Sequence, residues 1–543
     1  MWKCLFAGAL AAAISVAAAD DSFEITRFQV DGNTLLPAAE VQRTLAPMIG
    51  HNRVYGDVQK ALEALQLAYR RAGYSAVQVY VPEQELTGGT VRIQVTESVI
   101  FRITIQGNRR FSDANILASL PRLQTGRTPN LSAISESIQL ANENPAKQVA
   151  VQLNAGDEDG KIDAAIAVSE TPPWRAFVTL DNTGAPATGT WRTGVALQYA
   201  NLFDADQVGT LSYTNSPDSP RGVDVDLYSL GYRIPLYRIG DSVDFVYGKS
   251  NVNTPSASPT LGGILGLTGK GDIYGLRWNH LFARQGEYTS KVVFGFDDKK
   301  IDSRCDVNGT QVSTAPPTPP IAACVPYETR PLSLTYSGQK QSVNDEIDYS
   351  IGISRNWATG TRYTNLTGRT DRYSYLTSGN RDTVDGFMTV SGDLSLLRTL
   401  AGDWQLRLAG SAQYADDPLV SSEQFGLTGA TLVRGFTERA VVADSGVLAN
   451  LEVYTPELTA HAGLPGNLRL LSFYDLGRGY NSHVALSGVP SAVTVASVGV
   501  GARYAISRYF TMRLDAARVN NSGTSTTEER GDWYAHLSVM VGY

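Results

Sequence analysis

The residues most able to do chemistry in this sequence are an arginine and an aspartate that lie in two short motifs. The motif residues are Val433, Arg434, Gly435 and Phe436 in the first, and Phe473, Asp475 and Gly477 in the second. A guanidinium and a carboxylate that meet away from water form short, charge-assisted hydrogen bonds. The chemistry that these residues offer is therefore an ion-pair lock and not a covalent reaction.

Three strand-like runs must position this pair. Alternating residues at Trp404–Tyr414 and Val447–Tyr454 flank the first motif, and a third run, Leu468–Leu476, carries the aspartate. Because successive strand side chains point to opposite faces, Asp475 shares a face with the other residues of its motif. The opposite face is apolar, with Leu468, Leu470, Tyr474 and Leu476. This pattern predicts a barrel strand whose apolar face meets lipid and whose aspartate points inward.

The two motifs together resemble the paired motifs of the Omp85 superfamily. With two small modules before the barrel, the chain looks most like the outer-membrane transporters of two-partner secretion, the haemolysin secretion/activation branch. The resemblance implies that Arg434 lies on an extracellular loop that folds into the barrel lumen, where it contacts Asp475. Taken alone, Arg434 would be interpreted as a solvated loop arginine, and the second motif and the barrel pattern favour the lock.

The N-terminus predicts export from the cytoplasm. Residues 1–19 contain Lys3, an apolar run from Leu5 to Val16, and then three alanines before Asp20. A charged start, a short apolar centre and small residues at the end are typical of a cleaved secretory signal. We expect cleavage after Ala19. The chain then leads almost directly into a strand, so we expect the plug helix that often precedes the first module in proteins of the resembled family to be absent or very short here.

Composition excludes some classes of function. The chain has 46 Lys and Arg residues against 53 Asp and Glu residues, a formal charge of −7, so no basic surface for nucleic acid is indicated. After Ala19 no apolar run approaches the roughly 18 residues that a membrane-spanning helix needs. A closed barrel of alternating strands can still cross a membrane, because it satisfies its backbone groups internally.

The stretch before the barrel contains two similar modules, at residues 20–97 and 98–170. Each begins with a strand that ends in Gly-Asn, and Gly32 and Gly107 lie 107 − 32 = 75 residues apart. Two helices and two strands follow, an order that looks like the POTRA domain, which in the resembled family binds the unfolded passenger in the periplasm. We expect one apolar helix face at Val58, Leu62, Leu65 and Tyr69, and helix N-caps at Ser112 and Ser132. A role as mere spacers remains the alternative.

Residues 171–543 predict an all-β transmembrane barrel of about sixteen antiparallel strands, so the fold class is α+β modules followed by a barrel. Pro172 and Pro173 mark the boundary, and Val447, Ala449, Leu451 and Val453 alternate with Asn450 and Glu452, which we expect to line the lumen. A simpler alternative for Asn450 and Glu452 is that they are polar residues facing the water of a channel, with no further role. A soluble β-sandwich would show similar alternation. The last run ends with Tyr543 on its apolar face, which resembles the signal read by the barrel-insertion machinery.

Loop lengths should alternate between the two ends of such a barrel. Four long connections follow odd-numbered strands, near 251–269, 301–326, 358–381 and 417–443, the last being the inward-folded loop. The connections after even-numbered strands are short, except 456–466.

Cys305 and Cys324 fall in one long loop, and an oxidising compartment predicts a structural disulfide between them. Metal binding by two lone cysteines is a weaker alternative.

No catalytic, cofactor or metal motif is found. The sequence lacks a zinc-protease helix motif, a Gly-x-Ser-x-Gly elbow and a P-loop, and its five histidines are scattered. The resemblance stated above implies a channel that secretes an unfolded β-rich exoprotein, with outer-membrane lipid and the insertion machinery as its other partners. Alternatives are a barrel assembly factor of the same superfamily and a passive porin. The sequence leaves open whether the passenger is an adhesin, a cytolysin or a toxin.

Overall fold

The computed structural model describes residues 22–85, 88–251, 256–257, 266–267, 270–307, 310–485 and 487–543. The expected secretory signal and the start of the chain before the first strand lie outside these residues, as does most of the loop expected at 251–269. The chain forms two compact units. One contains the described residues up to Thr104 with Arg122–Ile134 and Gln152–Ala165, and the other contains the described residues of Ile105–Pro121, Ser135–Val151 and Ile166–Tyr543.

The first module has two helices and a small sheet. Its elements are β1 Phe23–Ile25, β2 Arg27–Asp31, α1 Ala38–Leu45, the short η1 Ala46–Met48, β3 Gly50–Arg53, α2 Tyr55–Arg71, β4 Val77–Tyr80 and β5 Thr90–Glu97. The sheet order is β2-β5-β4, in which β5 runs parallel to β2 and antiparallel to β4. Strands β1 and β3 pair separately. Both β2 and β4 are edge strands of the three-stranded sheet.

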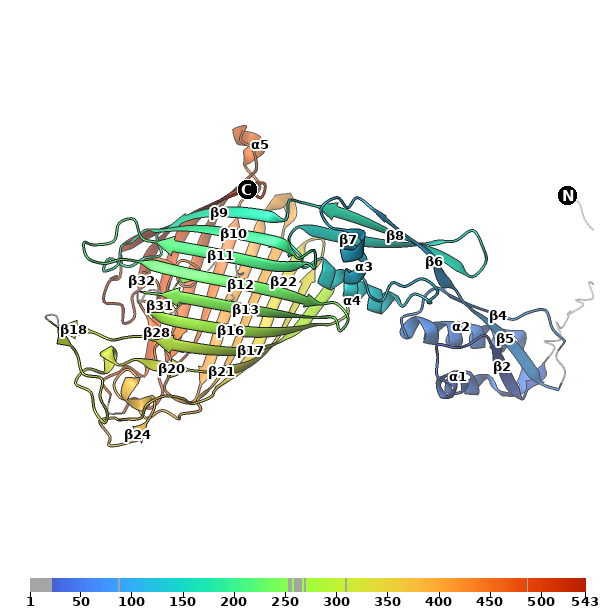
Figure 1. Ribbon diagram of the computed structural model, residues 1–543, viewed down its shortest axis with the longest axis horizontal. Coiled ribbons are helices and arrows are strands. Elements are labelled where there is room, and N and C mark those ends of the chain that lie inside the picture. The colour runs from blue at the N-terminus through green and yellow to red at the C-terminus, as the bar shows by residue number, and fades with distance from the viewer. Residues whose placement is uncertain are drawn as a thin grey trace, which may run out of the picture. The chain divides into compact units, whose positions relative to one another are not determined.

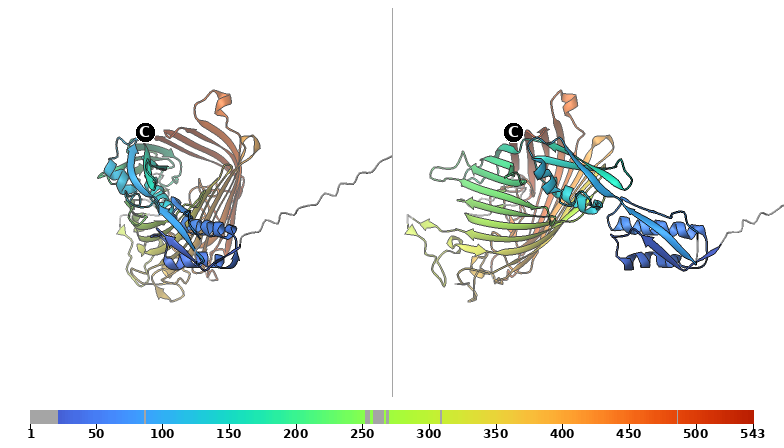
Figure 2. Two further views of the ribbon diagram at one scale, coloured as in Figure 1. Left: turned by 90° about the vertical axis from the view of Figure 1, so that its right-hand side faces the viewer. Right: turned by 45° about the vertical axis from the view of Figure 1, so that its right-hand side comes forward.

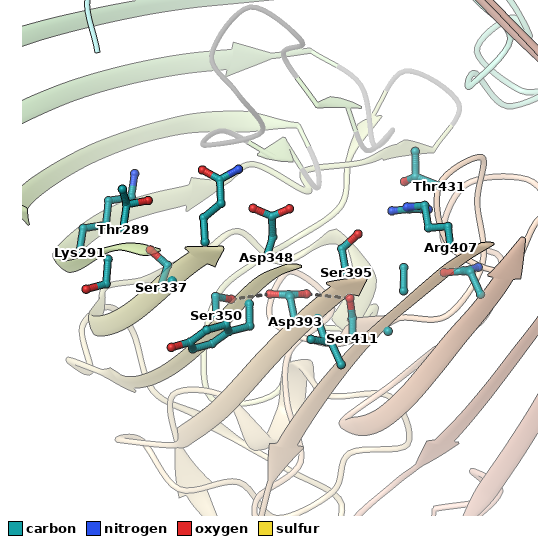
Figure 3. Close-up of a pocket in the computed structure, with 18 of the residues that line it drawn as sticks. Thr289, Lys291, Ser337, Asp348, Ser350, Asp393, Ser395, Arg407, Ser411 and Thr431 are labelled. Carbon is teal, nitrogen blue, oxygen red and sulfur yellow. Dashed lines mark hydrogen bonds between the residues drawn. The ribbon is translucent and has the colours of Figure 1, made fainter. Parts of the chain in front are cut away.

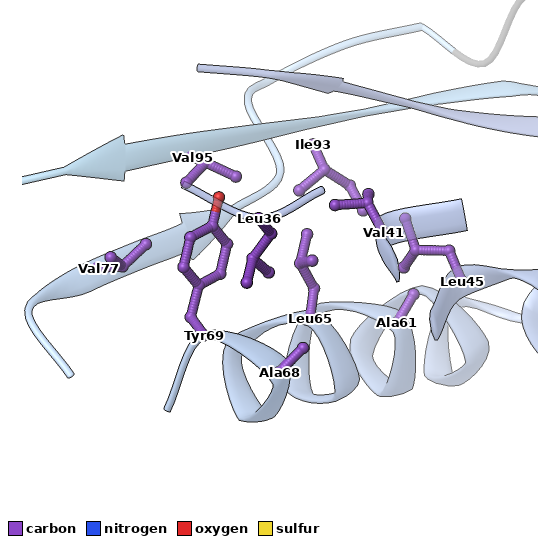
Figure 4. Close-up of a cluster of buried hydrophobic side chains, with 10 residues drawn as sticks. All are labelled: Leu36, Val41, Leu45, Ala61, Leu65, Ala68, Tyr69, Val77, Ile93 and Val95. Carbon is purple, nitrogen blue, oxygen red and sulfur yellow. The ribbon is translucent and has the colours of Figure 1, made fainter. Parts of the chain in front are cut away.

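The core of this module lies between the helices and the sheet. The expected face of α2 is confirmed, because Val58, Leu65 and Tyr69 are buried and Leu62 is half-buried. Figure 4 shows Leu65 and Tyr69 facing Ile93 and Val95 of β5. The helix ends at Arg71, and Gly73 follows with a φ of +92°. The sequence spacing therefore placed the buried face of this helix correctly.

Replacing Gly32 with Ala should destabilise the first module. Gly32 has a φ of +84°, and a Cβ there would lie 2.2 Å from the backbone carbonyl oxygen of Val95. The strained backbone and the clash should together lower the free energy of unfolding of this module by about 2 kcal/mol or more. Hydrogen exchange of the full chain should show faster exchange in 22–97. In the matched control, Gly56→Ala, the new methyl group meets only the Val54 side chain at 3.8 Å, so protection should not fall.

The second module repeats this order. Its elements are β6 Val99–Gln106, α3 Asp113–Ser119, α4 Leu131–Ala141, β7 Lys147–Ala155 and β8 Lys161–Glu170, with the sheet order β6-β8-β7. Ser112 caps α3, since its side chain accepts a hydrogen bond from the Asn115 N–H at 3.1 Å. The expected cap at Ser132 is wrong. Helix α4 begins at Leu131, and the Asn130 side chain accepts from the Ala133 N–H at 3.0 Å, so Ser132 lies inside the first turn.

Sixteen long antiparallel strands form a closed barrel, as predicted. They are β9 Trp174–Asp181, β10 Arg192–Leu202, β11 Gln207–Asn215, β12 Asp226–Leu236, β13 Asp241–Ser250, β16 Gly271–Leu281, β17 Tyr288–Ile301, β21 Pro331–Gln341, β22 Asp345–Asn356, β25 Met388–Thr399, β26 Gln405–Ala415, β29 Ser445–Tyr454, β30 Asn467–Tyr480, β31 Ala492–Ile506, β32 Phe510–Asn521 and β33 Trp533–Gly542. The short β20, Tyr327–Thr329, precedes β21 along β17. Figure 1 shows the strands side by side, and Figure 2 shows the sheet curving back on itself.

The barrel closes where the last strand pairs with the first. Strand β33 pairs with β9 from Ser538 opposite Asp181 to Gly542 opposite Phe177. The Tyr543 ring is exposed and stacks on Trp174 with ring centroids 4.8 Å apart. Along the strands, large apolar side chains alternate outward with smaller or polar side chains inward, which rules out two open layers. Among the residues that the structure describes, no helix combines the length and apolar composition needed to cross a membrane.

Connections differ in length between the two rims of the barrel. When the barrel strands are counted from β9 as the first, the connections after odd-numbered strands are long. These connections carry small elements: β14 Ser256–Ala257, β15 Gly266–Leu267, β18 Asp306–Val307, β19 Thr310–Gln311, η3 Ala322–Cys324, β23 Tyr363–Thr364, β24 Thr370–Asp371, η4 Ser374–Leu376, β27 Phe425–Gly426 and β28 Val442–Ala443. The other rim has short turns, including η5 Ala401–Asp403, and one longer connection with α5 Thr459–Ala462. We call these the long-loop rim and the short-turn rim.

Candidate functional site

The connection between β26 and β29 folds into the barrel. Its two short strands, β27 and β28, pair with each other, and the segment between them forms a compact tip. The tip packs on the inner wall through a set of fully buried side chains that we call the tip cluster. The cluster contains Leu427, Val433, Phe436 and Val441 of the loop, with Val493 and Val495 of β31 and Val519 of β32. A loop with its own apolar contacts to the wall is a fixed part of the lumen.

Arg434 makes a bidentate ion pair with Asp475 on the wall strand β30. The Arg434 Nε donates to Oδ2 of Asp475 at 2.7 Å, and its Nη2 donates to Oδ1 at 2.8 Å. The backbone N–H of Arg434 also donates to the same carboxylate, at 3.1 Å. The Asp475 side chain is fully buried and that of Arg434 is 3% exposed. This geometry joins the loop to the wall with charge-assisted bonds in a site that excludes water.

Further charges surround the pair and balance it. The Arg434 Nη1 lies 2.8 Å from Glu452 of β29 and 3.4 Å from Asp515 of β32. Arg407 lies 3.1 Å from Glu452, and Arg503 lies 2.9 Å from Asp515. Three guanidinium groups therefore face three carboxylates. A buried network of this kind depends on every partner, because removal of one leaves an uncompensated charge.

Neutral side chains complete the contacts of the loop tip. The Asn450 amide donates to the Leu432 carbonyl oxygen and to the Asp475 carboxylate, both at 2.8 Å. The Arg434 guanidinium lies over the Phe473 ring, 3.5 Å from its centroid, which suits a cation–π contact. The Gly435 N–H donates to Nε2 of His536 at 3.0 Å. These side chains of the wall therefore contact either the Arg434 guanidinium or the backbone of the residues beside Arg434.

The glycines of both motifs have physical reasons for being glycines. Gly435 has a φ of +95°, a conformation that residues with a Cβ rarely adopt. At Gly477 a Cβ would lie 3.1 Å from Cγ2 of Val433 and 3.2 Å from Cδ2 of Leu427. The missing side chain thus lets the tip cluster lie directly on strand β30. Phe436 lies in the same cluster and has no exposed surface.

The residues expected to line the lumen do point inward, but they do not simply face water. Asn450 and Glu452 are both nearly fully buried and contact the loop. The sequence analysis missed Asp515 and His536 as parts of the site. Both lie at inward positions of strands whose outward positions are apolar, so the alternation marked their direction. It gave no sign that they approach Arg434, because the order of residues along a strand does not tell which loop lies opposite.

A cavity of about 540 Å³ lies in the lumen beside the tip. Thr431 and Asn450 mark the tip side, while β17, β21, β22, β25 and β26 form the far wall. That wall has many hydroxyl groups; Figure 3 shows Asp393 accepting hydrogen bonds from Ser350 at 2.9 Å and Ser411 at 2.7 Å. Lys291 and Arg407 offset the nearby acids. The surface is polar without a strong charge of either sign, and no three His, Cys, Asp or Glu side chains in the described parts of the chain could hold a metal.

A second buried ion pair ties three long loops together. The Arg381 guanidinium, from the loop between β22 and β25, pairs with Asp444, and neither side chain has exposed surface. Asp444 also accepts from the N–H groups of Leu419 and Ser482, each at 3.0 Å, and Arg381 donates to the Ser482 carbonyl at 2.7 Å. We call this the loop clamp. The sequence analysis missed it, since both residues lie beside predicted loop ends where charged residues are usually solvated.

Cys305 and Cys324 form a disulfide, with a Cα–Cα distance of 5.1 Å. It closes one long loop, and the segment it encloses contacts the neighbouring loop, where the Thr364 N–H donates to the Pro317 carbonyl at 2.8 Å. The bond therefore supports the packing of two loops at the long-loop rim.

Replacing both cysteines with serine should loosen this loop and leave export unchanged. The cysteines are 19 positions apart, and closing a loop of that size stabilises by about 3 kcal/mol. Trypsin treatment of intact cells should cleave the variant in residues 301–330 several-fold faster than the parent. Secretion should stay within about twofold, because surface loops tolerate such changes better than fixed elements do. A secretion defect as large as that of an Arg434 variant would contradict a purely structural role.

Two family models match the chain. The model described as "Haemolysin secretion/activation protein ShlB/FhaC/HecB" matches residues 160–504, and the model "POTRA domain, ShlB-type" matches residues 23–98. The first match covers more than half of the chain and includes both motifs of the lumen site. The second covers the first module.

Known proteins of similar sequence and structure agree with these matches. The chain is 22% identical over 440 residues to "Outer membrane transporter CdiB" of Escherichia coli O6:K15:H31, which covers 78% of this chain and 67% of that protein. It is 21% identical over 540 residues to "Heme/hemopexin transporter protein HuxB" of Haemophilus influenzae. That alignment covers 95% of this chain and 87% of the relative. The solved structure "CdiB from Escherichia coli" superposes on this chain with a TM-score of 0.74 at 20% sequence identity. The superposition covers 98% of this chain and 93% of the CdiB chain.

Proposed function

Since this chain belongs to the haemolysin secretion/activation protein family ShlB/FhaC/HecB, we propose that it secretes an unfolded partner protein across the outer membrane. It is an outer-membrane barrel whose POTRA modules lie in the periplasm. The short-turn rim therefore faces the periplasm and the long-loop rim faces the outside. The transported partner is an exoprotein that folds at the cell surface, and folding outside makes its return unfavourable. No catalytic step is needed.

The observation that supports this function best is the division of the lumen into two walls. The inward loop is fixed on the wall formed by β29 to β32, through the Arg434 network and the tip cluster. The opposite wall, from β17 to β26, is covered with hydroxyl groups and balanced charges and borders the open cavity. An extended polypeptide of varied sequence needs such a surface, since strong charges or apolar patches would retain it. We propose that Arg434 and Asp475 act as a lock that keeps the path open on that side.

The periplasmic modules offer sheet edges for the passenger. In the first module β2 and β4 are edge strands, and in the second β6 and β7 are. An extended chain can pair with such an edge through main-chain hydrogen bonds, which recognise a strand with little regard to its sequence. We propose that the modules, at 20–97 and 98–170, capture the passenger in this way before it enters the barrel at 171–543. We also propose that Tyr543 takes part in recognition by the insertion machinery.

A secretion assay in a deletion strain, combined with planar-bilayer conductance, tests this function. Cells that lack the gene should accumulate the unfolded exoprotein in the periplasm, and the gene in trans should restore it at the surface. Purified barrel should conduct ions. If other barrels fail to assemble in the deletion strain, the protein is an assembly factor. If conductance is present and no protein is lost from the surface, it is a passive porin.

A further inference from the structure

The second module is clamped to a turn at the short-turn rim by a buried polar cluster. Asp206, in the turn between β10 and β11, forms an ion pair with Lys147 in which neither side chain is more than 1% exposed. Asp206 also accepts from Asn115 at 3.1 Å and from the Tyr237 hydroxyl at 2.5 Å. Burial lowers the pKa of Lys147, and the neighbouring Asp206 carboxylate opposes that shift. The clamp fixes the start of α3 against the barrel turn.

A cavity of about 500 Å³ lies beside this clamp, between the two elements that it joins. One side is formed by Arg109 and Arg110 of the second module, and the other by Tyr199, Phe203 and Asp204 of the barrel. Ser112 bonds the Asp204 carboxylate with both its N–H and its hydroxyl. The walls are thus held in place from both sides.

The two arginines are fixed by their backbone and free at their ends. The N–H groups of Arg109 and Arg110 donate to the Glu170 carboxylate at 3.1 Å and 2.9 Å. Both residues are exposed, and neither guanidinium has a partner within the part of the chain that the structure describes. Asp204 contributes one negative charge, so the cavity has a net charge of 2 − 1 = +1. Planar guanidinium groups are well suited to a phosphate oxygen pair.

The barrel side of the cavity faces lipid. Tyr199 continues the outward row of Val195 and Leu197 on β10, and all three are exposed. Phe203 follows in the turn and is 83% exposed, in a left-handed conformation with a φ of +59°. Aromatic side chains at the rim of a membrane barrel lie at the level of the lipid headgroups. A phenylalanine with so much exposed surface beside two unpaired arginines combines an apolar and a cationic contact.

We propose that this cavity binds a glycerophospholipid of the periplasmic leaflet, with its phosphate on Arg109 and Arg110 and its acyl chains along Tyr199 and Phe203. The lipid would join the second module to the membrane next to the Lys147–Asp206 clamp. The positive charge selects the phosphate, and the apolar pair selects a lipid over a soluble phosphate. This inference rests on the location of the barrel in the outer membrane, and it holds whether or not the barrel secretes a protein.

The test is native mass spectrometry of the full chain in detergent, titrated with phosphatidylglycerol. The double variant Arg109→Gln with Arg110→Gln should require roughly tenfold more lipid for the same occupancy, because each basic residue near an anionic headgroup contributes appreciably. The matched control is Arg122→Gln with Arg127→Gln, which removes the same charge from exposed positions of the same module that do not line the cavity. Both variants should keep the heat-modifiable gel mobility of a folded barrel.

Three results would overturn the proposal. The first is equal lipid occupancy in the cavity variant and in the control. The second is displacement of the lipid by inorganic phosphate in moderate excess, which would make this a site for soluble anions. The third comes from a variant of the apolar side. A third variant, Phe203→Ser, keeps both arginines and should lower lipid occupancy while leaving the weak binding of inorganic phosphate unchanged. If its lipid occupancy equals that of the parent, the apolar contact plays no part and the lipid assignment fails.

Discussion

Replacing Arg434 with Ala should reduce secretion about tenfold or more while the barrel still inserts and folds. The change leaves Asp475, Glu452 and Asp515 without their shared cation in a site that excludes water. Removing one partner from such a buried network costs about 3–5 kcal/mol. The loop tip should lose its fixed position, while the strands, which have their own hydrogen bonds, remain paired. Secreted passenger at the cell surface, measured against barrel content in the membrane, gives the comparison.

Two further variants show whether the effect belongs to the network. Arg478→Ala removes an exposed arginine from the outward face of the same wall strand and should leave secretion unchanged. Asp475→Asn keeps the shape and the acceptor oxygen but removes the charge opposite Arg434, so it should show a defect close to that of Arg434→Ala. Normal secretion by both lumen variants would mean that the loop does not depend on this ion pair.

Replacing Arg381 with Ala should open the long loops at the outer rim. Asp444 would stay buried without its cation, although it still accepts hydrogen bonds from Leu419, Gln424 and Ser482. The loss should destabilise the packed loops by about 3–5 kcal/mol, as for other buried pairs that lose one partner. Proteolysis on intact cells should cleave residues 357–387 and 416–424 about tenfold faster or more.

The control for the loop clamp is Arg369→Ala in the same loop. Arg369 pairs with Asp371 at 2.9 Å, but its side chain is 42% exposed. The buried Asp371 carboxylate keeps its hydrogen bonds from the N–H groups of Tyr373 and Ser374 when Arg369 is removed. An ion pair whose guanidinium is this exposed contributes about 1 kcal/mol or less, so the cleavage pattern should hardly change. If Arg381→Ala and Arg369→Ala behave alike, the buried pair does not hold the three loops together.

Local sequence patterns predicted most of the fold because strand alternation and turn chemistry are local properties. Asp475, Asn450 and Glu452 were assigned to the inner face from a period of two, and the long and short connections fell on the expected rims. The N-cap of α4 was placed wrongly at Ser132 because Asn130 and Ser132 are both good caps, and sequence alone does not choose between neighbours. The antiparallel pairing of β1 with β3 was missed, since Gly50–Arg53 has no strand pattern.

The contacts between distant segments were the part that sequence could not supply. Arg434 and Asp475 were brought together through a family resemblance, and no pattern in the chain indicated Asp515, His536 or the Arg381–Asp444 pair. Such pairs depend on how loops fold back across the barrel, which involves residues far apart in the chain. Lys147 with Asp206 is a similar case, 59 positions apart. A charged residue next to a predicted loop is solvated in most proteins, so burial of these pairs has no local signal.

If Arg434 acts by holding the loop tip on the wall, a covalent link between tip and wall should replace it. A Cβ at Gly477 would lie 3.1 Å from Cγ2 of Val433, close to the about 3 Å between one sulfur and the other Cβ of a disulfide. The pair Val433→Cys and Gly477→Cys should therefore bond, and can be placed in a chain that carries Arg434→Ala and serines at positions 305 and 324.

The measurement is secretion by this chain with the new disulfide oxidised and then reduced. Oxidation should restore secretion to near the level of the parent with Arg434, and reduction should return it to the low level of the Arg434→Ala variant. If the bond forms in a folded barrel and secretion stays low in both states, Arg434 does something other than hold the tip, and the account is wrong.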